Sequence, residues 1–211
     1  GEANDEGGTQ PVAVQDIGPQ LYTGEAVTFE GLEGVTYAGL TTGGLGDKPA
    51  ALKCGTDYDL TYMNNTNAGA ATVILLGKGN YAGSRAVPFQ IQPKTIYVEL
   101  GAPEKTYGEI DPDYVWTAYE TVMKDGEEVY QPISVPITGK PGRDPGEDAG
   151  KYTLSLTEQG STLSAGSNYT LAWKDGTAPE LTITPKAIGN TDQTAAERIG
   201  ASIGYMEAKE G

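Results

Sequence analysis

The chain has 211 residues, a length that fits one large domain or two smaller ones. Its 14 basic and 29 acidic residues give a formal charge of −15, which would repel nucleic acid and an anionic membrane surface, so we expect no nucleic-acid partner. No apolar run approaches the length of about 18 residues that spans a membrane, so we expect no membrane insertion. There is no histidine and only one cysteine, which excludes His-based catalytic triads, the usual zinc sites and an intrachain disulfide.

The amino-terminal part of the chain predicts short strands after a polar leader. Residues 1–11 lack hydrophobic periodicity and are expected to form a flexible linker. From Val12 onward, short β-prone segments alternate with Gly-containing turns. Residues 41–50, TTGGLGDKPA, are predicted to form a loop or hairpin tip. The first part of the chain is therefore predicted to be loop-rich β-structure.

Longer strands are predicted from residue 58 onward. Tyr58, Leu60 and Tyr62 alternate with polar residues, which predicts a strand with one apolar face. Further strands are predicted over residues 71–76, 86–91, 95–100, 114–119, 128–135, 152–156, 168–173 and 180–184. Residues 101–113 are expected to form a crossover rich in Pro and Gly, and residues 192–199 have the only helix-like composition.

Two stretches of the chain share one pattern. Residues 67–94 and 148–186 both run from Ala-Gly, through alternating segments and Asn-Tyr, to an apolar strand closed by Pro-Lys. This repeat predicts two β modules, over residues 12–93 and 94–186, joined by a short linker. Short strands about ten residues apart favour an all-β fold of two tandem Ig-like β-sandwich modules. Residues 187–211 are predicted to form either a tail or the start of a truncated third repeat.

Two tyrosines within the repeated pattern are expected to be structural. Tyr81 and Tyr169 each follow an Asn and precede a final strand. A ring at such a position can pack at the edge of the core with its hydroxyl bonded to the backbone.

Specific motifs resemble known bacterial repeats. The segments GKGNYAG at residues 77–83 and FQI at 89–91 resemble Ig-like repeats of multidomain surface proteins from Gram-positive gut bacteria. In the second module, KTYGEIDP at residues 105–112 and LTITPK at 181–186 resemble the MBG type of repeat, marked by its Tyr-Gly-x turn. The resemblance implies an extracellular module, in the cell wall or secreted, of the kind used in adhesins. Two enlarged segments, 31–54 and 157–166, depart from the pattern.

If the modules bind a ligand, two kinds of residue are the candidates. Trp116 and Trp173 could stack on a sugar ring, although their place in predicted strands favours packing in the core. Asp144, Glu147 and Asp148 belong to the acidic loop 139–150, which is the candidate binding loop. These carboxylates suit calcium, the one cofactor considered, but the loop lacks the regular spacing of a calcium loop.

No constellation of reactive side chains stands out in the sequence. An intramolecular amide between Lys and Asn or Asp, found in some Gram-positive surface Ig modules, requires a nearby acid as well, and nothing in the sequence singles out such a trio. We therefore expect a monomeric, non-enzymatic stalk or spacer that contributes to adhesion. A module that binds a host or bacterial glycan or a surface protein is an alternative. An accessory region of a large secreted glycan-degrading enzyme is another.

Overall fold

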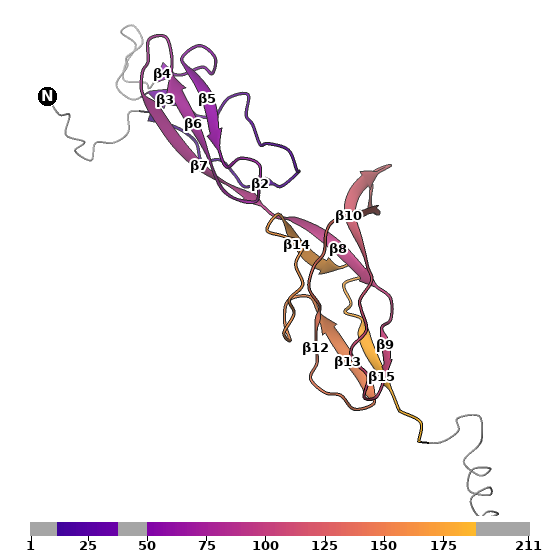
Figure 1. Ribbon diagram of the computed structural model, residues 1–211. Coiled ribbons are helices and arrows are strands. Elements are labelled where there is room, and N and C mark those ends of the chain that lie inside the picture. Colours follow the sequence, from indigo (N-terminus) through magenta and orange to yellow (C-terminus); the bar gives the residue numbers. More distant parts are fainter. Residues whose placement is uncertain (1–11, 38–49, 189–211) are drawn as a thin grey trace, which may run out of the picture. The chain divides into compact units, whose positions relative to one another are not determined.

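The computed structural model describes residues 12–37 and 50–188 (Figure 1). All regular secondary structure in this part of the chain is β-strand, which confirms the predicted all-β class. The chain divides into two compact units: unit 1 comprises Gly1–Ile96 and Ala165–Leu171, and unit 2 comprises Tyr97–Ser164 and Ala172–Gly211. The predicted linker 1–11, all but the last residue of loop 41–50, and the carboxyl-terminal residues from 189 lie outside the described residues.

Unit 1 contains seven strands among the described residues, in two small sheets. Its strands are β1 (Val12–Ala13), β2 (Gln20–Leu21), β3 (Thr36–Tyr37), β4 (Ala50–Ala51), β5 (Tyr58–Met63), β6 (Gly69–Gly77) and β7 (Ser84–Gln92). One sheet has the order β1-β3-β4 and the other β2-β7-β6-β5. The core lies on one face of the larger sheet, where Val73, Leu75, Phe89 and Ile91 are buried.

The predicted alternation in β5 is confirmed. Tyr58 is buried, Leu60 and Tyr62 are half-buried on the same face, and the intervening residues are exposed. The Tyr62 hydroxyl accepts a hydrogen bond from Phe29 N at 2.8 Å, and the Tyr58 hydroxyl accepts one from Leu32 N at 3.3 Å. These tyrosines therefore fill the core and also satisfy the backbone of the preceding segment.

Unit 2 is built from two four-stranded sheets. Its strands are β8 (Lys94–Leu100), β9 (Glu104–Thr106), β10 (Trp116–Lys124), β11 (Glu127–Ile133), β12 (Gly142–Arg143), β13 (Gly150–Ser155), β14 (Tyr169–Trp173) and β15 (Glu180–Thr184), the first residues of β8 and β14 being grouped with unit 1. The sheet orders are β11-β10-β8-β14 and β12-β13-β15-β9. Leu154, Leu181 and Ile183 form the buried centre of the second sheet.

The β10–β11 hairpin is longer than predicted. Its strands meet at Asp125 and Gly126, whose φ angles of 54° and 87° are those of a two-residue hairpin turn. The pairing runs without interruption from Lys124↔Glu127 to Ala118↔Ile133. The predicted strand end at Tyr119 was wrong, because the Asp-Gly pair supplies the left-handed conformations that a tight turn requires and lets both strands continue to it.

The predicted crossover over residues 101–113 was partly wrong, because it contains β9. This strand pairs in parallel with β15, in the register Thr182↔Glu104 to Thr184↔Thr106. Unit 1 has the same arrangement near its amino end, where β2 pairs in parallel with β7. In each unit a strand from the early part of the chain therefore runs alongside the last strand and in the same direction.

The enlarged segment 157–166 packs onto the loop that precedes β12. Thr138 and Ser164 form a β-bridge, and Thr162 N donates to Lys140 O at 3.0 Å. Gly142 is buried, and a Cβ atom there would overlap the Glu158 carbonyl oxygen and lie 2.7 Å from Gln159 O. The close approach of these two loops thus depends on glycine.

Candidate functional site

Lys105 is the one charged residue that is buried among the described residues, with 5% of its surface exposed. It lies in β9, at the register position opposite Ile183 of β15, so its side chain starts from the core side of the sheet. A buried ammonium group is costly unless every donor finds an acceptor. The surroundings of Lys105 are therefore a candidate functional site.

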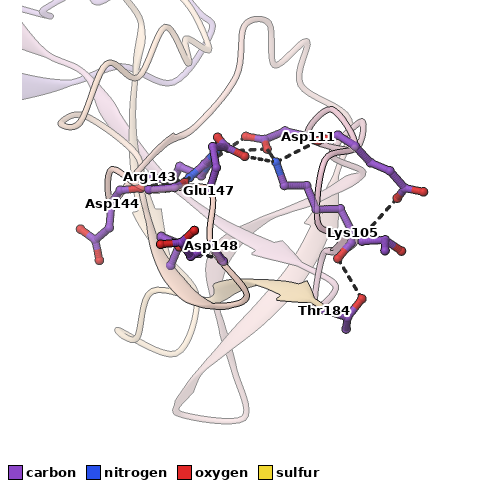
Figure 2. Close-up of polar contacts among 11 residues, drawn as sticks. Lys105, Asp111, Arg143, Asp144, Glu147, Asp148 and Thr184 are labelled. Atoms are coloured by element: carbon purple, nitrogen blue, oxygen red, sulfur yellow. Dashed lines mark hydrogen bonds and ion pairs between the residues drawn. The ribbon is translucent and has the colours of Figure 1, made fainter. Parts of the chain in front are cut away.

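All three hydrogens of the Lys105 ammonium group have an acceptor (Figure 2). Nζ donates to Glu109 O at 3.1 Å, to Asp111 Oδ1 at 2.7 Å and to Glu147 Oε2 at 2.6 Å. Two of the acceptors are carboxylates, which compensate for the loss of water around the charge.

Arg143 completes the arrangement from the other side of the two carboxylates. Its Nε donates to Asp111 Oδ2 at 2.8 Å, and one Nη atom contacts both Asp111 Oδ1 and Glu147 Oε1. The other Nη donates to Asp144 O at 3.2 Å and to Gly146 O at 2.6 Å. We call Lys105, Asp111, Arg143 and Glu147 the buried-lysine cluster. It carries two positive and two negative charges and is neutral as a whole.

The pKa values of the cluster favour its charged state. Hydrogen bonds to Asp111 and Glu147 hold the pKa of Lys105 above its usual value. Burial on its own would raise the pKa of Asp111, but the hydrogen bonds from Arg143 and Lys105 outweigh it and leave the pKa lowered. The Lys105 hydrogen bond also lowers the pKa of Glu147. All four groups are therefore ionised at neutral pH.

The Tyr-Gly turn directly follows Lys105 and shapes one wall of the cluster. Glu109 N donates to Thr106 O at 3.0 Å, which closes a four-residue turn with Gly108 at φ +87°. A positive φ at the third position is the mark of a type II turn and favours glycine there. The turn places the Glu109 carbonyl over the Lys105 ammonium, so the repeat's motif and the buried charge form one structural unit.

The structure divides the three acidic residues predicted as ligand candidates. Glu147 is part of the buried-lysine cluster, with one oxygen on Lys105 and the other on Arg143. Asp144 accepts a hydrogen bond from Thr153 N at 3.2 Å, and Figure 2 shows its carboxylate pointing away from the cluster. The Asp148 carbonyl accepts from the Tyr152 hydroxyl at 2.8 Å. The acidic loop is thus folded back onto its own module.

Trp116 and Trp173 lie together on one sheet, as stacked rings with centroids 5.9 Å apart and an interplanar angle of 26°. Both are half-buried, and Trp173 packs against the core cluster of Leu154 and Leu181.

The opposite face of the same sheet instead carries three tyrosines. Tyr97 and Tyr119 each contact Tyr130 edge-to-face, and the Lys174 ammonium lies 4.1 Å from the Tyr119 ring centre. Sequence reasoning missed this tyrosine face.

The cluster also contains a trio that the sequence did not single out. A lysine amine lies within hydrogen-bond distance of two carboxylates, Asp111 and Glu147. An amide bond between Lys105 Nζ and Asp111 Cγ would require a neutral amine and a protonated carboxyl group. The raised pKa of Lys105, the lowered pKa of Asp111 and the Arg143 contact all favour the ion pair instead. The geometry is that of a structural ion-pair network.

A family model matches residues 96–182, with the description "MBG domain (YGX type)". Residues 96–182 are an MBG domain. The matched range contains the Tyr-Gly turn and every member of the buried-lysine cluster, so the cluster belongs to the body of the MBG domain. Neither the curated proteins nor the solved structures yielded a match to the chain.

The described residues contain neither a group of metal-ligating side chains nor a membrane-spanning helix. Within residues 12–37 and 50–188, no group of three or more His, Cys, Asp or Glu side chains is placed to hold a metal ion. No helix in those ranges is long and apolar enough to cross a membrane. The strongest polar constellation in the MBG domain is thus a set of internal ion pairs.

Proposed function

We propose that the chain is a non-enzymatic spacer segment of a bacterial cell-surface or secreted protein, built from Ig-like sandwich modules, and that its task is to carry tension. The MBG domain supports this proposal because the domain is typical of repeats in bacterial surface proteins. The observation that carries it is the parallel pairing of an early strand with the last strand in each unit.

The direction of pairing determines how such strands respond to force. When the chain is pulled from its two ends, parallel neighbours slide along one another, and all the hydrogen bonds between them are loaded together. Antiparallel neighbours joined by a hairpin are pulled apart at one end, and their bonds break one at a time. The pairs β2–β7 and β9–β15 therefore resist tension better than a hairpin would.

The buried-lysine cluster reinforces the loaded strand in unit 2. Lys105 lies in the middle of β9, and its ammonium group is bonded to Asp111 and Glu147. Sliding β9 along β15 pulls this charge away from both carboxylates, which costs more than breaking the backbone bonds alone. Glu147, one of the residues that the sequence suggested for ligand binding, would then contribute to mechanical strength.

Single-molecule force spectroscopy tests the proposal. We expect the chain, pulled from its two ends, to show two unfolding events. In a Cys54→Ser variant, handles attached through Glu104→Cys and Thr182→Cys pull apart the first residue pair of the β9–β15 ladder, and we expect unit 2 to open at a lower force. Equal forces in the two geometries would refute a load-bearing role for the parallel pair.

The tyrosine face supports a second candidate function, binding of a glycan or a surface protein. Tyr130 is 42% exposed and Met123 is 70% exposed on the hairpin that carries this face. The Tyr119 and Tyr130 hydroxyls are bonded to Glu99 and to the Lys174 carbonyl, so the rings are held in place. A glycan array probed with the whole chain tests this candidate, with Tyr130→Ala as the variant that should lose any signal.

A further inference from the structure

A cavity of about 180 Å³ lies at one end of the core of unit 1. It is lined by aromatic, aliphatic and charged side chains from β1, β3, β5, β6 and β7, from the segment between β4 and β5, and from the loop between β6 and β7. The side chains that matter here are those of Tyr37, Leu52, Asp57, Tyr58, Tyr81 and Arg85. None of them belongs to the MBG domain or to the buried-lysine cluster.

Arg85 has an unusual place in its strand. In β7, residues 87, 89 and 91 are buried on the core face, and Arg85 continues the same alternation at the end that borders the cavity. Its cross-strand neighbour is the buried Leu75. A cation thus occupies a position where the strand pattern calls for an apolar residue.

The Arg85 guanidinium is not fully satisfied by the part of the chain that the structure describes. Its Nε atom is shielded from solvent and has no hydrogen-bond partner among the residues that the structure describes. A buried charged donor without an acceptor is destabilising, and an anionic oxygen is the acceptor that a guanidinium binds best. Arg85 also lines the cavity, so a carboxylate that enters the cavity would have a guanidinium as its partner.

The loop between β6 and β7 builds the wall opposite. Gly77 N donates to Gly83 O at 2.9 Å, and a Cβ atom on Gly77 would lie 2.8 Å from the Ala82 backbone, so only glycine permits this close fold. The fold presents Tyr81 beside Tyr37, with ring centres 5.7 Å apart. Tyr81 was expected to bond its hydroxyl to the backbone, but no such bond occurs within the described residues, and its ring borders the cavity instead.

We propose that this cavity binds the carboxylate-bearing ring of an acidic sugar. Arg85 donates hydrogen bonds to the carboxylate, and the tyrosine rings pack against the apolar face of the pyranose. Asp57, whose Oδ2 is bonded to Lys53 N at 2.8 Å, lines the same cavity and accepts hydrogen bonds from sugar hydroxyls. A cavity of about 150 Å³ holds benzene, so this one accommodates the ring of the sugar while its outer hydroxyls remain in solvent. This inference is independent of the spacer function.

The test is an NMR titration of the whole chain with D-glucuronate. We expect saturable amide shifts confined to residues 77–86 and their cavity neighbours. D-glucose should bind at least about tenfold more weakly, because it lacks the charge-assisted pair, and benzoate should also bind more weakly, because it offers no hydroxyl to Asp57. Arg85→Met should abolish the shifts. Lys78→Met on the same loop should retain them, because Lys78 is exposed and pairs with Asp59.

Several results would overturn the inference. Absence of saturable shifts with glucuronate refutes the site, equal binding of glucose refutes carboxylate recognition, and equal binding of benzoate refutes the sugar. If Arg85→Met does not fold, Tyr81→Ala replaces it, because Tyr81 is half-buried outside the strands. Unchanged glucuronate binding by a folded Tyr81→Ala or Arg85→Met variant places the ligand elsewhere and refutes the assignment.

Discussion

Replacing Lys105 by methionine removes the central cation of the buried-lysine cluster and keeps a side chain of similar length. Removing one partner of a buried ion pair costs about 3–5 kcal/mol when the other partner stays buried. The cost is smaller here because the Asp111 and Glu147 side chains are 30% and 63% exposed and both retain Arg143. We therefore expect Lys105→Met to lower the free energy of unfolding of unit 2 by about 2 kcal/mol.

The chain has a built-in probe for this measurement. Its only two tryptophans, Trp116 and Trp173, both belong to unit 2, so tryptophan fluorescence follows the unfolding of that unit alone. Unfolding in urea has a slope of about 1 kcal/mol per molar for a small domain, so the midpoint should fall by about 2 M. Unit 1 contains no tryptophan and does not contribute to this signal.

A matched control separates the loss of stability caused by breaking the cluster from the general effect of losing a positive charge. Lys151 is in the same unit, pairs with Glu180 at 2.9 Å and has a 67% exposed side chain. Lys151→Met should change the stability by less than about 0.5 kcal/mol. Equal effects of the two substitutions, or a midpoint shift below about 0.5 M for Lys105→Met, would refute the role that we assign to the cluster.

Three further predictions concern the same unit. The pKa values of Asp111 and Glu147 are lowered from 3.8 and 4.5, so the stabilisation that these carboxylates supply is present above those values and is lost as pH falls through their lower folded-state pKa values. The difference in stability between the native chain and Lys105→Met should therefore shrink in acid. A difference that stays constant with pH would contradict this expectation. Gly142→Ala should destabilise unit 2 by more than about 2 kcal/mol, since its Cβ meets the Glu158 carbonyl, whereas Gly101→Ala, which meets open space, should be nearly neutral in the same urea assay. Intact-mass spectrometry should give the full mass of the sequence, because a loss of one water would reveal an amide at Lys105 that the ion-paired geometry disfavours.

Local patterns in the sequence were sufficient for most of the longer strands and for the all-β class, but not for β9 or for the full length of β10. The alternation of Tyr58, Leu60 and Tyr62 places these residues on one face, because successive side chains of a strand point to opposite sides. The Tyr-Gly motif at residues 107–108 indicated the MBG type of repeat that the family match then showed. The Asp125-Gly126 turn was equally readable, since that pair is a strong local signal for a hairpin.

The tertiary structure alone decided which of these residues meet. Lys105, Asp111, Arg143 and Glu147 come from two segments more than 30 residues apart, and nothing local in either segment shows that their charges pair. The same holds for Arg85, which lies just outside the predicted strand 86–91 and whose Nε lacks an acceptor among the residues that the structure describes. Strand alternation and turns are set by neighbouring residues, but pairing of charges depends on how sheets and loops pack, and that packing is a property of the whole chain.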